Sequence, residues 1–141
     1  MFKILVLCKN NAVLSPMAEG YLRKFAGDDN DVYSAGTVLE KVDPVVIGLM
    51  KEDEIDLSGM IQHKLDDFKH IDFDFVLTCD EESNAISHHL PAKPVKYHFD
   101  FHKLVPENLK KSDKENVYKK VRDKIKKTML SFIRNHFNDS K

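Results

Sequence analysis

The sequence has few cysteines, no excess of charge of one sign and no long hydrophobic run. Two cysteines in 141 residues are too few for the disulfide framework of a small secreted protein, so we expect both thiols to be reduced. A formal net charge of −1 at pH 7 argues against a surface that binds nucleic acid. No apolar run approaches the roughly 20 residues of a membrane span, and the apolar stretch after Lys3 is too short for a signal peptide. These absences predict a cytoplasmic protein without a membrane or nucleic-acid partner.

The chain is long enough to bury a core of its own, and we expect a single domain over residues 1–141. Segments typical of strands occur at 2–8, 31–36, 73–79 and 95–99. Helices are predicted at 15–27 with Ser15 as N-cap and Gly27 as the stop, at 43–50, at 80–90 and from 113 onward, with a brief helical turn at 65–68. This alternation predicts an α/β fold in which a four-stranded parallel sheet carries helices on both faces.

The stretch CKNNAVLS, residues 8–15, connects the first predicted strand to the first predicted helix. Such a connection can present a nucleophile and a ring of backbone N–H groups to an anion. Cys8 and Cys79 both fall at the carboxyl ends of predicted strands, where parallel sheets bind ligands. A thiolate beside a helix N-terminus is expected to have a lowered pKa and to be reactive. The alternative is that Cys8 is a small buried side chain that closes a strand.

Five segments, taken in order, resemble the low-molecular-weight protein tyrosine phosphatase family, and more closely its thioredoxin-coupled arsenate reductase branch. The segments are SPMAEGYLRKFAG, VYSAGT, VDPVVIGLMKEDEIDLSG, DFVLTCDEE and YKKVRDKI. The resemblance covers nearly the whole chain and implies the α/β fold already expected from the alternation of elements. It also implies a specific site, because the anion loop of that family reads C-x5-R-S.

In that family the cysteine attacks the substrate, backbone amides hold the oxyanion, and the arginine clamps two of its oxygens. The resemblance assigns the nucleophile to Cys8 and the loop asparagine to Asn11, with Ser15 as the serine after the arginine. It assigns anion binding to the rest of the loop as well, which comprises Lys9, Asn10, Ala12, Val13 and Leu14. No metal or cofactor is implied.

This sequence departs from the family pattern at two loop positions. Leu14 stands at the arginine position, and losing one preorganised donor from an oxyanion site typically costs ~3–4 kcal/mol, or ~100- to 1000-fold in rate. Lys9 is a candidate replacement charge, although lysine lacks the planar fork of arginine; the alternative is a solvated surface lysine. Asn10 stands where the family has glycine, and asparagine adopts left-handed backbone angles more readily than most residues.

Cys79 falls where the reductase branch keeps a cysteine that resolves the oxidised nucleophile. The spacing from Asp74 to Cys79 is one residue shorter than in that branch, and the next cysteine of the pattern, expected near Ile86, is absent. A Cys8–Cys79 disulfide therefore stays open as an alternative to a purely structural Cys79. If it forms, a thioredoxin- or glutaredoxin-like reductant must complete the cycle.

Asp100 occupies roughly the general-acid loop of the family, although Phe101 follows it where the family usually has proline. Four histidines in the same half of the chain do not fit an established metal-ligand spacing, so we read them as surface or loop residues. These histidines are His88, His89, His98 and His102.

Three functional hypotheses follow. The first is an arsenate reductase-like or phosphatase-like enzyme that uses Cys8 on a phosphoryl or arsenate centre, with activity impaired by Leu14. Its partners would be an oxyanion, a phosphorylated small molecule or a phosphoprotein. The second is a catalytically inactive relative that binds an anion or a protein through the same pocket. The third is a thiol switch in which Cys8 and Cys79 close a disulfide.

Overall fold

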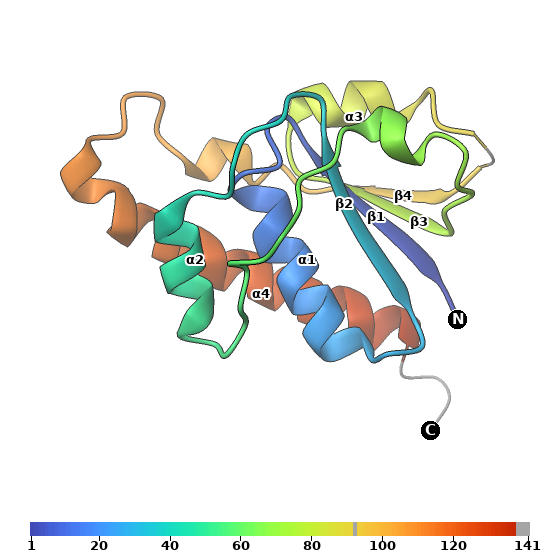
Figure 1. The fold of residues 1–141 in the computed structure, drawn as a ribbon, viewed down its shortest axis with the longest axis horizontal. Coiled ribbons are helices and arrows are strands. Elements are labelled where there is room, and N and C mark those ends of the chain that lie inside the picture. Colours follow the sequence, from blue (N-terminus) through green and yellow to red (C-terminus); the bar gives the residue numbers. More distant parts are fainter. Residues whose placement is uncertain (92, 138–141) are drawn as a thin grey trace.

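The computed structural model describes residues 1–91 and 93–137. Its four strands form one parallel sheet in the order β2-β1-β3-β4 (Figure 1). They are β1 (Lys3–Cys8), β2 (Asp31–Gly36), β3 (Phe75–Thr78) and β4 (Val95–His98). The predicted α/β fold with a four-stranded parallel sheet is therefore confirmed. Residues 138–141 of the expected domain lie outside the described residues.

Helices cover both faces of the sheet. They are α1 (Leu14–Ala26), α2 (Pro44–Lys51), α3 (Glu81–Ser87) and α4 (Lys114–Phe137), with short 3-10 helices η1 (Leu65–Phe68), η2 (His102–Leu104) and η3 (Lys111–Asp113). Helices α1 and α4 pack together on one face, while α3 lies on the other (Figure 1). Within the described residues, no helix is both long enough and apolar enough to span a membrane.

The central strand β1 is apolar on both faces because each face carries a separate part of the core. Ile4, Val6 and Cys8 belong to the cluster that α1 and α4 complete. Leu5 and Leu7 belong to the cluster on the opposite face, which includes residues around η1. Alternate side chains of a strand point to opposite faces, so the periodicity of β1 places the Cys8 side chain on the α1 side.

The start of α1 differs from the expectation. The helix begins at Leu14, its N-cap residue is Val13, and the N-cap makes no side-chain hydrogen bond. The prediction that Ser15 caps α1 is therefore wrong. The hydroxyl of Ser15 instead lies against Cys8 and Asn11, which removes it from the capping position. The predicted stop is confirmed, because α1 ends at Ala26 and Gly27 follows with φ 89°.

Three other elements, α2, β3 and α3, were predicted to within a few residues of their observed ends. Asp43 caps α2 by accepting from the Val45 N–H, with Pro44 in the first turn. Strand β3 and helix α3 are both shorter than expected. Asp80, which was expected inside the helix, lies outside it and caps it by accepting from the Ser83 N–H. An N-cap residue has non-helical backbone angles, so Asp80 separates the strand from the helix.

Gly36, the last residue of β2, allows the loop after β1 to approach the sheet closely. A Cβ atom added at Gly36 would lie 2.9 Å from the Lys9 carbonyl oxygen and 2.9 Å from the Cβ of Asn11. The first of these contacts is with backbone, which cannot give way as the end of a flexible side chain can. The close fit of β2 against the loop therefore requires glycine at this position.

Gly36→Ala is expected to lower the free energy of unfolding by about 1–3 kcal/mol, because the added methyl group overpacks a site bounded by backbone. Gly48→Ala is the matched control, since a Cβ at Gly48 in α2 meets nothing within 4 Å. Alanine is favoured over glycine in a helix by about 1 kcal/mol, so this control should be at least as stable as the native protein. Urea unfolding midpoints measure both effects, and a native-like midpoint for Gly36→Ala would contradict this account.

Candidate functional site

Backbone hydrogen bonds hold the loop of residues 9–13 at the carboxyl end of β1. The Lys9 carbonyl accepts from the Thr37 N–H at 2.9 Å and from the Val38 N–H at 3.0 Å. The Ala12 carbonyl accepts from the Asp43 N–H at 3.1 Å. These bonds join the loop to the segment between β2 and α2, so the loop is part of the rigid sheet edge.

Asn11 organises the inside of the loop. It is fully buried and has φ 53°, in the left-handed region that few residues other than glycine and asparagine adopt. Its side-chain amide donates to Ser15 Oγ at 2.7 Å and to Ser34 Oγ at 3.1 Å, and its Oδ1 accepts from the His63 N–H at 3.3 Å. Asn10, for which the sequence left this conformation open, does not have a positive φ; Asn11 has it, and three hydrogen-bond partners fix its side chain there.

Cys8 lies beneath the loop with 3% of its surface exposed. Its Sγ lies 2.8 Å from Ser15 Oγ and accepts from the Asn11 N–H at 3.2 Å. Burial nevertheless raises the pKa of the Cys8 thiol above its ordinary value, because desolvation outweighs the hydrogen bonds from Ser15 and Asn11, and the charge of Asp80 adds to the increase. The expectation of a lowered pKa is wrong, and Cys8 is a neutral thiol near neutral pH.

Leu14 is the first residue of α1 and is buried, with 5% of its surface exposed. Its side chain belongs to the apolar cluster that α1 and α4 share, and it also lines the cavity at the loop. Hydrocarbon therefore occupies the wall of the cavity where the family resemblance places a cationic guanidinium. A leucine side chain offers no hydrogen bond to an oxyanion.

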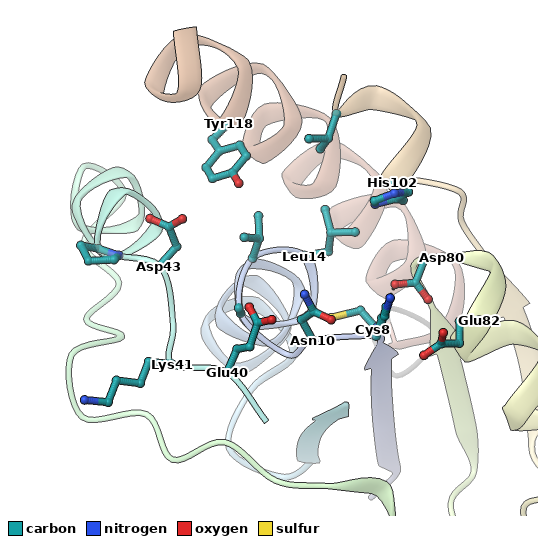
Figure 2. A pocket seen from close by; sticks show the side chains of 15 residues that line it. Cys8, Asn10, Leu14, Glu40, Lys41, Asp43, Asp80, Glu82, His102 and Tyr118 are labelled. Atoms are coloured by element: carbon teal, nitrogen blue, oxygen red, sulfur yellow. The ribbon is translucent and has the colours of Figure 1, made fainter. Parts of the chain in front are cut away.

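A cavity of about 620 Å³ opens over the Cys8 loop (Figure 2). The loop contributes Cys8, Lys9, Asn10, Ala12, Val13 and Leu14 to its lining. Asn11 and Ser15 do not line it, because they are buried beneath the loop. The other walls come from Glu40, Lys41, Asp43 and Pro44, from Asp80 and Glu82, and from His102, Val105 and Tyr118. The cavity has the size of an ordinary small-ligand pocket.

Asp80 is one of several cavity residues that sequence reasoning missed, together with Glu40, Glu82 and Tyr118. One of its carboxylate oxygens accepts from the Lys9 N–H at 2.8 Å, and the other accepts from the Ser83 N–H at 2.9 Å. It thus joins the Cys8 loop to α3 while it faces the cavity. The available signal was its place immediately after a buried strand, three residues before a serine, in the arrangement of a helix N-cap.

Lys9 and Asp100 occupy different positions relative to the cavity. Lys9 lines the cavity and is exposed, and the structure shows no ion pair for it among the described residues. Asp100 is half-buried and is not among the lining residues. The exposed His102, two residues further along, lines the cavity instead, while Phe101 between them is buried in the core. A general-acid role for Asp100 stays a prediction.

Cys79 follows β3 directly and is 1% exposed. The β1–β3 register pairs Leu7 with Thr78, so Cys8 and Cys79 come next on neighbouring strands and share the apolar cluster under α1. Both cysteines are free thiols in the structure, and Cys79 does not line the cavity. Desolvation by burial raises the pKa of the Cys79 thiol well above its ordinary value.

Within residues 1–91 and 93–137, the structure contains no group of three or more histidine, cysteine or carboxylate side chains placed to hold a metal ion. His98 instead lies between two protein groups, with Nδ1 2.8 Å from Thr78 Oγ1 and Nε2 3.2 Å from Glu81 Oε1.

Comparison with known proteins gives consistent results. The family described as low molecular weight phosphotyrosine protein phosphatase matches residues 3–139. An arsenate reductase of Halalkalibacterium halodurans is 33% identical over 129 residues, which cover 92% of this chain and 93% of the relative. A glutaredoxin arsenate reductase of Synechocystis is 33% identical over 78 residues, which cover 55% of this chain and 60% of the relative. The crystal structure of the tyrosine phosphatase Wzb from Escherichia coli K30 in complex with sulphate has a TM-score of 0.75 at 20% identity, over 96% of this chain and 99% of that chain, and shows the shared fold.

Proposed function

The chain belongs to the low molecular weight phosphotyrosine protein phosphatase family, and from this premise we propose that it is a catalytically impaired member whose Cys8 pocket binds a ligand without processing oxyanions efficiently. The observation that carries the proposal is Leu14, an apolar side chain in the cavity wall at the position of the family's arginine. Losing one preorganised donor costs ~3–4 kcal/mol of transition-state stabilisation. Losing a full charge that faces a dianion costs more.

The protonation state of Cys8 also supports impaired chemistry. A thiolate, not a thiol, is the nucleophile in cysteine catalysis. Because burial raises the pKa of Cys8, only a small fraction of this thiol is ionised at neutral pH. In an arginine-containing pocket a nearby guanidinium would favour the thiolate, whereas the charge that acts on Cys8 here is the carboxylate of Asp80.

The architecture of the loop is nonetheless retained. Its backbone is fixed by Asn11, Gly36 and Asp80, and the α1 N-terminus lies beside it. Backbone N–H groups and a helix N-terminus can hold an anion weakly without a side-chain cation. We therefore expect weak oxyanion binding without measurable Cys8-dependent turnover, with the pocket itself intact.

Hydrolysis of an aryl phosphate by the native protein, Cys8→Ser and Leu14→Arg tests the proposal. We expect the native rate to equal the Cys8→Ser background, and a Cys8-dependent rate to appear when the guanidinium is restored in Leu14→Arg. Thiol-dependent consumption of arsenate is assayed in parallel, because similar proteins are named arsenate reductases. A native rate for either substrate that Cys8→Ser abolishes would overturn the proposal.

The strand register favours a second candidate, the Cys8–Cys79 thiol switch. Neighbouring strands lie about 4.8 Å apart, which falls within the Cα separations that disulfides span. The last in-register pair of β1 and β3 is Leu7 with Thr78; Cys8 and Cys79 each follow a member of this pair, and both lie in one apolar cluster. With hydrogen peroxide as oxidant, one thiol becomes a sulfenic acid and the other displaces water from it to close the disulfide. Its reduction would need an external thiol, as the expected thioredoxin- or glutaredoxin-like partner supplies.

Disulfide formation should be slow at neutral pH and should accelerate as the pH rises toward the raised pKa values of the two thiols, above the ordinary thiol range. The reason is that thiolates react, and burial raises the pKa of both thiols, so that each loses its proton only in alkaline solution. Intact-mass spectrometry without reductant measures the loss of two hydrogens in the native protein, with Cys8→Ser and Cys79→Ser as controls. Free thiols, overoxidised thiols or mixed disulfides alone, at every pH, would rule out the switch.

A further inference from the structure

The charges that line the Cys8 cavity are mainly negative. Four carboxylates and two lysines contribute to its walls: Glu40, Asp43, Asp80 and Glu82, against Lys9 and Lys41. A pocket that serves oxyanions would carry the opposite excess, because charges of one sign in a cleft concentrate ions of the other sign. The apolar Leu14 is thus accompanied by an excess of carboxylates in the same cavity.

Within the part of the chain that the structure describes, a side-chain cation neutralises only one of these carboxylates. Asp43 pairs with Lys114 at 2.5 Å. Asp80 accepts from two backbone N–H groups, and Glu82 accepts from the hydroxyl of Thr37 at 2.6 Å. In residues 1–91 and 93–137, neither carboxylate makes an ion pair. Among the described residues, the structure shows no hydrogen bond or ion pair for Glu40.

The positions of the charges strengthen this imbalance. Figure 2 shows the side chain of Lys41 extending away from Cys8, whereas Asp80 and Glu82 lie near Cys8. The negative charge of Asp80 acts on the Cys8 thiol and contributes to its raised pKa. Near Cys8 the cavity therefore combines two carboxylates, Asp80 and Glu82, and one lysine, Lys9, with a neutral thiol.

The remaining lining residues are suited to contact the apolar part of a ligand. Val13, Leu14 and Val105 supply hydrocarbon, and the half-buried ring of Tyr118 supplies an aromatic surface. Aromatic rings attract ammonium and guanidinium groups through their electron-rich faces, and Lys114 already lies 5.6 Å from the centroid of the Tyr118 ring. A second cavity of about 600 Å³ shares His102, Val105 and Tyr118 with the first, so the accessible space is elongated.

We propose that the Cys8 cavity binds an amine- or guanidine-bearing ligand with an apolar stem, its cationic group directed to the carboxylates of Glu40, Asp80 and Glu82 and its stem packed along Leu14 and Tyr118. The chemistry is that of a lysine or arginine side chain, whether free or within a peptide. The proposal rests on the proposed function, because it requires a pocket that no longer serves oxyanions. It goes further by naming the charge and shape of the ligand.

Isothermal titration calorimetry of the native protein with four small probes tests the ligand class. The probes are N-acetyl-arginine amide, N-acetyl-lysine amide, N-acetyl-citrulline amide and phenyl phosphate. Citrulline amide is the neutral isostere of the arginine probe and reports what shape alone contributes. An arginine-containing alanine peptide and its citrulline analogue form a separate arm, which distinguishes a peptide source from a free small molecule by the affinity gained with chain length.

Two substitutions that change the charge of the cavity in opposite directions test whether the probe binds in this cavity. Glu40→Gln removes a negative charge and should weaken binding of the cationic probe by about two- to fivefold, whereas Lys9→Gln removes a positive charge and should strengthen it by a similar factor. Both side chains are exposed and make no ion pair among the described residues, so neither change should disturb folding. Tyr118→Phe should keep the affinity and Tyr118→Leu should lower it, because only the ring is needed.

Saturable binding of the arginine or lysine probe, absent with citrulline and shifted in opposite directions by Glu40→Gln and Lys9→Gln, is the expected result. Binding of phenyl phosphate that weakens in Lys9→Gln, binding of citrulline as tight as that of arginine, or no binding of any probe would each overturn the proposal. Failure here is separable from failure of the proposed function, because the latter is decided by Cys8-dependent turnover alone.

Discussion

The site depends on one buried side chain, the amide of Asn11. Its left-handed backbone gives the loop its turn, and its three hydrogen bonds connect the loop to α1, β2 and the segment before η1. The network continues inward, because Ser34 donates to the carboxylate of Glu19, which is also paired with Arg23. A buried polar network of this kind specifies one arrangement only when every member is satisfied, and no buried side-chain nitrogen or oxygen atom in the described residues lacks a partner.

The same scaffold carries an electrostatic environment unlike the one its loop geometry implies. The loop geometry and the α1 N-terminus favour an anion. Burial of Cys8, the carboxylate of Asp80 and the hydrocarbon of Leu14 all disfavour one. The shape of the loop is maintained by groups beneath the cavity, such as Asn11 and Ser15, while the charge of the cavity is set by the groups that line it.

Local sequence signals predicted most of the fold and part of the site. The apolar strands, the Asp43 cap of α2 and the Gly27 stop of α1 depend on neighbouring residues, and all are present. Contacts between residues far apart in the chain could not be predicted from local sequence. Lys9 hydrogen-bonds to Asp80 across 71 residues, and His63 hydrogen-bonds to Asn11 across 52. The direction of the Cys8 pKa shift was missed for the same reason, since it is decided by how completely other segments exclude water from the thiol.

The central claim is that the loop is well formed but binds oxyanions only weakly. The most direct test is a titration with inorganic phosphate, followed through the amide resonances of residues 9–14 in the native protein and in Leu14→Arg. The account predicts well-dispersed loop resonances in both proteins, with saturable shifts at millimolar phosphate only when the guanidinium is restored. Saturable shifts of the native loop at equal or lower phosphate concentrations would contradict it.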